Sequence, residues 1–213
     1  MEILAPRTKE IDKSVRDAYW KLLHRCNISK AKNTLTQSPY VHCKYCITLN
    51  KEKLFNPEHA IFECPGVLEF WHCIINYVLK INRHFDNLLS FLTIISLGLH
   101  SMDNRDCHIS IRTATHNIIG LGIKTLTMFS IDSSNSPQKL LQSFRQQFRQ
   151  FMKNAVESKI NAHLSKHGTD PDFLPALRSS LASELSIWNI MRDNNPDSRR
   201  APTWSDYTYV DPV

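Results

Sequence analysis

Residues 41–71, "VHCKYCITLNKEKLFNPEHAIFECPGVLEFW", contain the pattern that decides the fold of this chain. Two cysteines stand two residues apart, and a histidine and a third cysteine follow after a gap, giving C-x2-C-x12-H-x4-C. Structural zinc takes four cysteine or histidine ligands in a tetrahedron, and the gap is long enough to return the chain to the first two thiolates. The pattern predicts a closed site for Zn2+ with no open position for a catalytic water. Its predicted ligands are Cys43, Cys46, His59 and Cys64.

Other interpretations of this pattern stay open at the level of sequence. A redox Cys-x2-Cys pair normally precedes a helix in a βαβ context, which "HCKYCITLN" lacks. His42 or His72 could replace His59 as the fourth ligand, although adjacent residues such as His42 and Cys43 rarely chelate one metal well. Chance cysteines in a core are isolated among apolar residues. That interpretation fits the remaining three, Cys26, Cys73 and Cys107.

Length and composition are those of an ordinary folded chain. The 213 residues suffice for one domain with a tail or for two small domains, and 42% of them are hydrophobic. The N-terminal residues contain no apolar run long enough for a secretory signal, so we expect a nuclear or cytoplasmic protein with reduced thiols. The most apolar stretch, residues 88–100, is too short to span a membrane and predicts a buried helix. We expect no membrane partner.

The chain is basic, with a net charge of +6 and a pI of about 9.0. Residues 1–65 have a net charge of +4 and residues 137–167 one of +5, whereas residues 170–213 have a net charge of −3. A basic surface is a mild indication of a polyanionic partner. The first basic segment includes the predicted zinc site.

Hydrophobic periodicity predicts a mostly α-helical fold. The expected helices cover residues 9–26, 65–82, 86–99, 106–131, 138–167 and 171–193. Trp20 and Trp71 are expected to be core residues that brace the zinc site, and "GLGIKTL" at 120–126 could interrupt its helix. The predicted organisation is a small zinc-stabilised helical module at 1–82, a helical bundle packed on it at 83–193, and a disordered, flexible C-terminal tail at 194–213.

The zinc-site region also resembles a known family. It combines a helix containing "YWKLL", the Cys-x2-Cys pair, "EHAIFECP" and a tryptophan shortly afterwards. In these features it is similar to the reverse transcriptase zinc-binding domain, which lies downstream of the polymerase in non-LTR, LINE-like retrotransposons. The residues that carry the resemblance are Trp20, Leu22, Leu23, Cys43, Cys46, Glu58, His59, Cys64, Pro65 and Trp71. They cover roughly residues 15–75, about a third of the chain.

This resemblance implies a zinc-binding module that follows a polymerase and helps to hold template RNA or target DNA. The chain itself contains no adjacent Asp-Asp pair of the kind found in a Tyr-x-Asp-Asp polymerase stretch. No other set of residues meets the geometric requirements of a catalytic site, so we expect no enzymatic activity. The chain would then be a separated or degenerate piece of such an element, or a gene derived from one.

Two sets of basic residues are candidates for phosphate contacts, with a solvated surface as the alternative for both. They are Lys44, Lys51 and Lys53 in or beside the zinc loop, and Arg145, Arg149 and Lys153, which repeat every four residues on the helix at 138–167. Another class of function also fits the sequence. It is a zinc-stabilised protein–protein interaction scaffold from a domesticated retroelement fragment, with the apolar helices between residues 86 and 131 as the docking surface.

Overall fold

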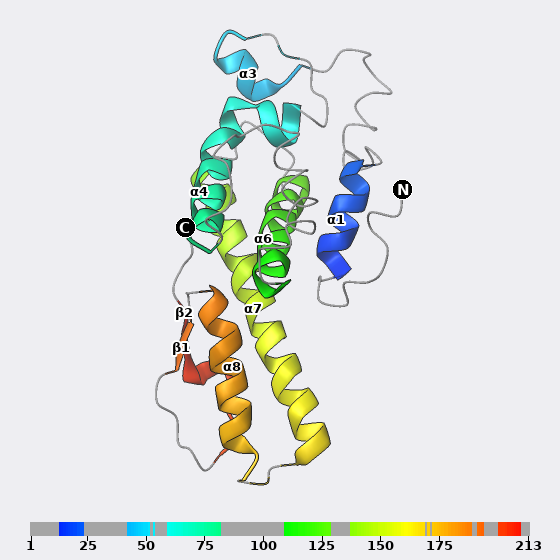
Figure 1. Ribbon diagram of the computed structural model, residues 1–213. Helices are drawn as coiled ribbons and strands as arrows, with labels where there is room; N and C mark the ends of the chain where they lie inside the picture. The colour runs from blue at the N-terminus through cyan, green and yellow to red at the C-terminus, as the bar shows by residue number, and fades with distance from the viewer. Residues whose placement is uncertain are drawn as a thin grey trace. The chain divides into compact units, whose positions relative to one another are not determined.

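The computed structural model describes residues 13–23, 42–51, 53, 59–81, 109–128, 137–168, 170, 172–188, 191–193 and 200–209. Within these ranges the chain is mostly helical, with one short two-stranded sheet (Figure 1). The predicted fold class is thereby confirmed. Contacts divide the chain into two compact units, Met1–Phe144 and Arg145–Pro212, and each is described by itself. The boundary between these units lies inside a helix. The division of the chain after residues 82 and 193 stays a prediction.

The first unit contains four of the predicted helical segments or parts of them. Its elements are α1 (Lys13–Leu23), α3 (Lys44–Thr48), the π-turn η1 (His59–Glu63), α4 (Pro65–Ile81), α6 (Ile109–Met128) and the first turns of α7 (Pro137–His167). The helix expected at 86–99 lies outside the described residues.

The most enclosed helix of this unit is α6, which is buried at every position from Ala114 to Ile123. Both α1 and α4 pack against it. A Cβ added to Gly120 would lie 2.2 Å from Val15 of α1, and one added to Gly122 would lie 3.0 Å from the Trp71 ring of α4. Residues two apart point to nearly opposite sides of a helix, so Gly120 lets α1 pack closely on one side of α6 and Gly122 lets α4 pack closely on the other. They allow close packing and do not interrupt the helix.

Two neighbouring aromatic residues of α1 differ in burial. Tyr19 is buried, and its ring stacks on His116 of α6 with the ring centroids 4.4 Å apart. The Tyr19 hydroxyl also donates to the His116 carbonyl at 3.4 Å, and burial raises the pKa of this phenol far above its usual range. Trp20 is 50% exposed, so its prediction as a core residue is wrong. Trp71 is fully buried, as predicted.

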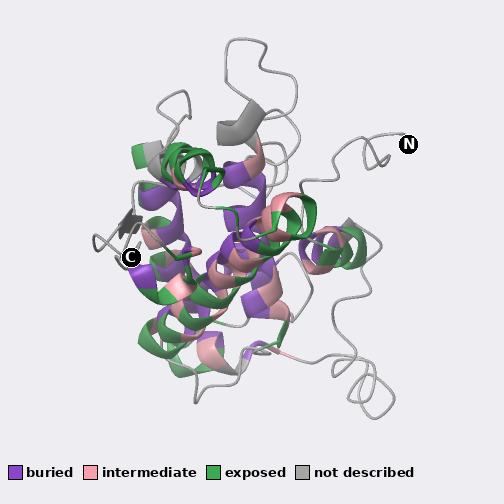
Figure 2. Ribbon diagram, turned by 90° about the horizontal axis from the view of Figure 1, so that it is seen from below, coloured by how far each residue is buried: buried purple, intermediate pink, exposed green. Residues whose placement is uncertain are grey.

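The second unit contains the rest of α7, α8 (Leu174–Trp188) and the antiparallel strands β1 (Met191–Asp193) and β2 (Tyr207–Tyr209). The α7 helix ends at His167 and is followed by Gly168, whose left-handed φ of 66° lets its N–H donate to the Leu164 carbonyl at 2.8 Å. Figure 2 shows buried positions along one side of the helices. In this unit they are Phe148, Met152, Val156 and Ile160 on α7, and Leu174, Leu177, Leu181 and Leu185 on α8.

Residues 200–209 are held by local polar contacts. The Arg200 guanidinium donates two hydrogen bonds to the Asp206 carboxylate, and the Thr203 N–H donates to the same carboxylate at 2.7 Å. Burial alone would raise the pKa of the Asp206 carboxyl, but these hydrogen bonds and the Arg200 charge outweigh it and lower the pKa. Arg178 of α8 donates to the Arg200 carbonyl at 2.8 Å, which ties this segment to the helix.

These contacts correct two predictions about the C-terminal region. A short 3-10 turn, η2 (Trp204–Asp206), precedes β2, and Tyr209 of β2 pairs with Met191 of β1. The prediction of a disordered tail is therefore wrong for residues 200–209. The helix predicted to reach residue 193 ends at Trp188, and β1 follows.

Gly120→Ala tests the close approach of α1 to α6. Its Cβ would lie 2.2 Å from Val15 Cγ1. We therefore expect the unfolding free energy to fall by about 1–3 kcal/mol, although alanine favours helix more than glycine does. Urea denaturation followed by far-UV circular dichroism measures the change. In a Val15→Ala background the nearest clashing methyl is gone, so the same substitution should cost much less; an equal loss in both backgrounds would contradict a steric origin.

Candidate metal site

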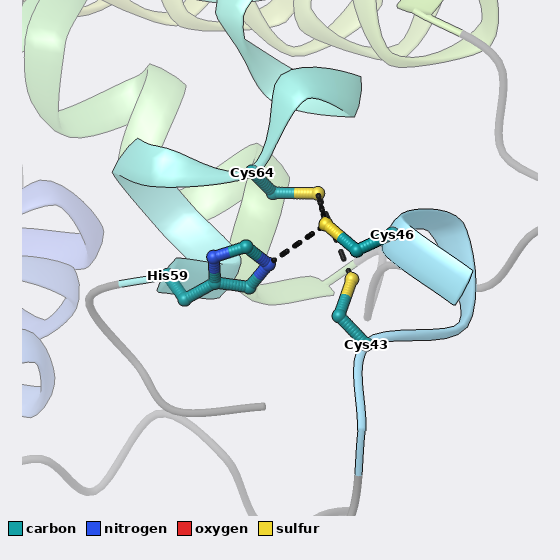
Figure 3. Close-up of side chains that lie close together, drawn as sticks. All are labelled: Cys43, Cys46, His59 and Cys64. Atoms are coloured by element: carbon teal, nitrogen blue, oxygen red, sulfur yellow. Dashed lines mark hydrogen bonds between the residues drawn. The ribbon is translucent and has the colours of Figure 1, made fainter. Parts of the chain in front are cut away.

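The four cysteine and histidine residues predicted as ligands come together in the first unit. Their ligand atoms all lie within 4.8 Å of one another, and all four residues are buried. Cys43 Sγ lies 3.7 Å from Cys64 Sγ, which in turn lies 4.0 Å from Cys46 Sγ. Cys46 Sγ lies 3.3 Å from His59 Nε2, and Figure 3 shows the four side chains converging from two segments of the chain. This group could hold a metal ion.

A hydrogen-bonded turn positions the two cysteines of the Cys-x2-Cys pair. Cys43 directly precedes α3, and the Ile47 N–H donates to its carbonyl at 3.0 Å. The carbonyl of Cys46 accepts from two N–H groups, those of Leu49 at 3.0 Å and Lys51 at 2.9 Å. These bonds fix both Cα–Cβ directions, so the thiols face the same side of the turn.

The chain then reverses and closes this turn. Asn50 has a left-handed φ of 55°, a conformation that asparagine tolerates better than most residues. Its N–H donates to the Ile47 carbonyl at 2.9 Å, and the Cys43 N–H donates to the Lys53 carbonyl at 2.8 Å. Five backbone hydrogen bonds thus hold residues 43–53 around the two thiols.

The other two ligand residues share the π-turn that precedes α4. The Cys64 N–H donates to the His59 carbonyl at 2.8 Å, which brings the two side chains to one end of α4. Pro65 occupies the first helical position, where its missing N–H removes no hydrogen bond. The Gly66 backbone N–H donates to the Cys64 sulfur. A thiolate at a helix N-terminus is stabilised by such donors and by the helix dipole.

Tyr45 and Gly66 join the two halves of the site. Tyr45 stands between the two cysteines of the pair, and a Cβ on Gly66 would lie 3.2 Å from three atoms of its ring. The ring therefore lies against the first turn of α4. Sequence reasoning did not identify this contact; its one signal was a glycine inside the first turn of an otherwise apolar helix, where glycine is unfavourable.

Trp71 connects the π-turn to the helical core. Its indole N–H donates to the Ile61 carbonyl within the turn. Its ring stacks on Phe62 with the centroids 5.7 Å apart and meets Phe70 edge-on at 5.6 Å. Since Trp71 also contacts Gly122 of α6, the position of His59 and Cys64 depends on how α4 and α6 pack.

Burial sets the protonation of the ligand residues in the absence of a metal charge. It raises the pKa of the Cys64 thiol, and also that of the Cys46 thiol, where the Lys51 charge acts weakly in the opposite direction. Burial lowers the pKa of His59, which keeps its imidazole neutral and able to ligate at neutral pH. A bound cation would reverse the thiol shifts, because it stabilises the thiolates directly.

The alternative ligands considered from sequence do not join this group. His42 is half-buried, His72 is exposed on α4, and neither belongs to the cluster among the described residues. Cys73 is a half-buried free thiol on α4, also outside the cluster. Cys26 and Cys107 lie outside the described residues.

The lysines predicted to contact phosphate lie on the turn formed by residues 43–53, which we call the metal-site turn. Lys51 and Lys53 are exposed, while their backbone groups form the hydrogen bonds that close the turn. Among the described residues neither forms an ion pair. Lys44 is the first residue of α3, and its side chain lies outside the description.

The second basic set lies on α7, within the second unit. Arg149 is exposed, whereas Arg145 is half-buried and its Nε has no access to solvent. The Lys153 ammonium lies 3.8 Å from the Glu157 carboxylate, one turn further along the helix. Arg149 is therefore the most accessible of these three cations.

No protein-family model, curated protein or solved structure matches this chain. None of the described helices combines the length and the apolarity that a bilayer crossing needs. The likeness to the retrotransposon family consequently rests on the residues quoted above.

Cys64→Ser should abolish tight metal binding, because it removes one of four converging ligands. We expect metal content after dialysis to fall from about one ion per chain to near zero, together with a loss of thermal stability. Elemental analysis and circular dichroism measure the two effects. Cys73→Ser is the matched control, since it changes a cysteine of the same region outside the cluster. A fully loaded Cys64→Ser protein would refute the ligand set.

Metal binding should also release protons. With both Cys46 and Cys64 raised in pKa, these thiols are protonated at neutral pH in the metal-free protein, and binding must displace their protons. The apparent metal affinity should therefore rise with pH and weaken as pH falls, between about pH 6 and 8. Titration calorimetry with Zn2+ in two buffers of different ionisation enthalpy counts the protons; an affinity independent of pH contradicts this assignment.

Proposed function

We propose that this protein is a zinc-binding, non-catalytic nucleic-acid-binding module, related to the segment downstream of the reverse transcriptase in non-LTR retrotransposons but separated from the polymerase. The observation that carries this proposal is the buried Cys3His group at the base of a turn whose outer side bears exposed lysines. The partner that the resemblance over residues 15–75 implies is template RNA or target DNA.

Zinc is the metal that the group suits best. With Zn–S bonds near 2.3 Å and Zn–N bonds near 2.0 Å, ligand atoms around a tetrahedral ion lie roughly 3.5–3.8 Å apart. The separations of 3.3, 3.7 and 4.0 Å between neighbouring ligand atoms are close to these values. Soft thiolates also favour zinc over magnesium or calcium.

A non-catalytic role follows from the ligand count. Four protein ligands complete the zinc tetrahedron, whereas catalytic zinc keeps one position for water or substrate. All four residues are buried, so a substrate has no path to the ion without displacing one of them. The metal would then have a structural role, which is to hold the turn that carries Lys51 and Lys53.

The alternative function, a protein-interaction scaffold, has less support. It was based on the apolar helices between residues 86 and 131 as a docking surface. The described part of that segment, α6, is buried between α1 and α4 along most of its length. Residues 86–99 lie outside the description. The metal-site turn with its exposed lysines is therefore the better candidate for a binding surface.

A salt titration of nucleic-acid binding tests the proposal. The full-length, zinc-loaded protein should bind a fluorescein-labelled RNA or DNA oligonucleotide with an affinity that falls steeply as salt rises, because each neutralised phosphate releases counterions. Fluorescence anisotropy measures this slope. In the double variant Lys51→Ala/Lys53→Ala the slope should decrease by about one per lost phosphate contact.

Lys21→Ala is the matched control for charge. Lys21 is an exposed cation of the same unit, but its ammonium already pairs with Asp17 at 2.7 Å. Lys21→Ala should therefore change the salt dependence of nucleic-acid binding little. A protein that contains zinc but binds neither RNA nor DNA at low salt would contradict the nucleic-acid proposal. The assignment of the metal site would not be affected.

A further inference from the structure

The outer side of the metal-site turn carries apolar groups as well as charge. Ile47 is 52% exposed and Leu49 is 44% exposed, although both belong to the most tightly hydrogen-bonded part of the turn. Thr48 and Asn50, which alternate with them, are exposed and polar. Figure 1 shows α3 beside the start of α4, at one end of the helices of its unit.

Such exposure is not needed to build the site. The turn is held by backbone hydrogen bonds and by its two cysteines, whose thiols point inward. The side chains of Ile47 and Leu49 contribute little to that framework, and a polar residue at either position would avoid exposing apolar surface. Two large apolar side chains are therefore exposed close together on a solvent-facing turn, where they are available for contact with a partner.

Charge indicates which partner this surface suits. Lys51 and Lys53 follow on the same turn, with Glu52 between them in the sequence, so residues 51–53 have a net charge of +1. Both lysines are exposed and form no ion pair among the described residues. A partner that satisfies both features needs phosphate groups spaced along a chain and accessible apolar faces between them. Unpaired nucleotides offer both, whereas in a duplex the base faces are stacked and hidden.

We propose that this turn binds single-stranded nucleic acid, with Ile47 and Leu49 contacting the faces of unpaired bases and Lys51 and Lys53 contacting the adjoining phosphates. Thr48 lies between the two apolar residues and Asn50 follows Leu49. The Thr48 hydroxyl donates to the Tyr45 carbonyl at 2.6 Å, so its oxygen can still accept from a base edge, and the Asn50 amide can hydrogen-bond to one. The turn is ordered before it binds, which lowers the entropic cost of association. This inference rests on the proposed nucleic-acid function and adds the strandedness of its ligand.

A membrane surface fits these residues less well. Binding to a lipid interface requires a wide apolar face buried several ångströms deep. Here each apolar residue has polar neighbours, and the two apolar positions are only two residues apart on a five-residue helix and its cap. The area is enough for one or two bases but small for a bilayer.

The test compares one mixed-sequence oligonucleotide as a single strand and as a duplex, by fluorescence anisotropy with the full-length, zinc-loaded protein. We expect tighter binding to the single strand. Ile47→Ser/Leu49→Ser should weaken single-strand binding by about tenfold, in line with the contribution of one or two base contacts. It should leave the salt slope unchanged, because no charge is removed, and it should leave duplex binding unchanged.

Met128→Ser is the matched control, since Met128 is 61% exposed on α6, away from the turn. It should bind like the wild type. Equal zinc content in all variants verifies that the metal site is intact, and the comparison of strand and duplex on the wild-type protein needs no variant.

The possible outcomes separate the two proposals. Equal or tighter binding to the duplex, or an unchanged single-strand affinity in Ile47→Ser/Leu49→Ser, overturns the single-strand inference while the nucleic-acid function stands. No binding to either form overturns both. A third outcome would also overturn the inference. If the wild-type protein binds anionic phospholipid vesicles and shows no preference for single strand over duplex, and if Ile47→Ser/Leu49→Ser loses the vesicle binding, the turn is a membrane-contact surface.

Discussion

The convergence of four ligand atoms within 4.8 Å is the constraint on which the N-terminal half of this fold depends. Three buried thiols and a buried imidazole form a poor core without a metal, because they bring polar groups together and gain little apolar contact. A bound ion changes this balance. Structural zinc contributes on the order of 10 kcal/mol at neutral pH, which is as much as the entire stability of a typical domain. Folding of the turn and binding of such an ion would then be a single process.

The site is coupled to the helices through a few residues that carry no ligand atom. Trp71 holds the π-turn by one hydrogen bond and one ring stack, and it meets α6 at Gly122. Gly120, two residues before Gly122 on α6, lets α1 pack closely against another side of the same helix. The same helix that brings the core together therefore also sets the position of His59 and Cys64.

Much of this arrangement could be predicted from sequence, for physical reasons that differ by element. The ligand group follows from local spacing, because few residue types bind soft metals and four of them lie within 22 positions. The helices follow from apolar periodicity. The expectation that Trp20 lies in the core beside the metal site was wrong, because burial on α1 depends on a partner from another helix. Tyr19 stacks on His116, a residue nearly one hundred positions away, whereas Trp20 is exposed.

The C-terminal region shows a second reason for error. Its order comes from the paired hydrogen bonds of Arg200 and Asp206 and from three-residue strands, neither of which produces a periodic pattern. The contact between Tyr45 and Gly66 is similar, because it joins two segments through one ring and one missing side chain. Features built from single contacts between distant segments are specified by the fold and not by local sequence.

The proposed roles of this turn divide between its inward-facing and its outward-facing side chains. With a bound Zn2+, three thiolates and the ion would have a net charge of −1, so Lys51 and Lys53 would gain some stabilisation by lying near the site. That gain is small for exposed cations and does not explain why Ile47 and Leu49 are exposed beside them. In our proposal the inward-facing cysteines hold the turn through the metal, whereas the outward-facing side chains contact the partner. Among the described residues no hydrogen bond or ion pair joins the two sets of side chains, so we expect substitutions on the outer side to change partner binding without loss of metal.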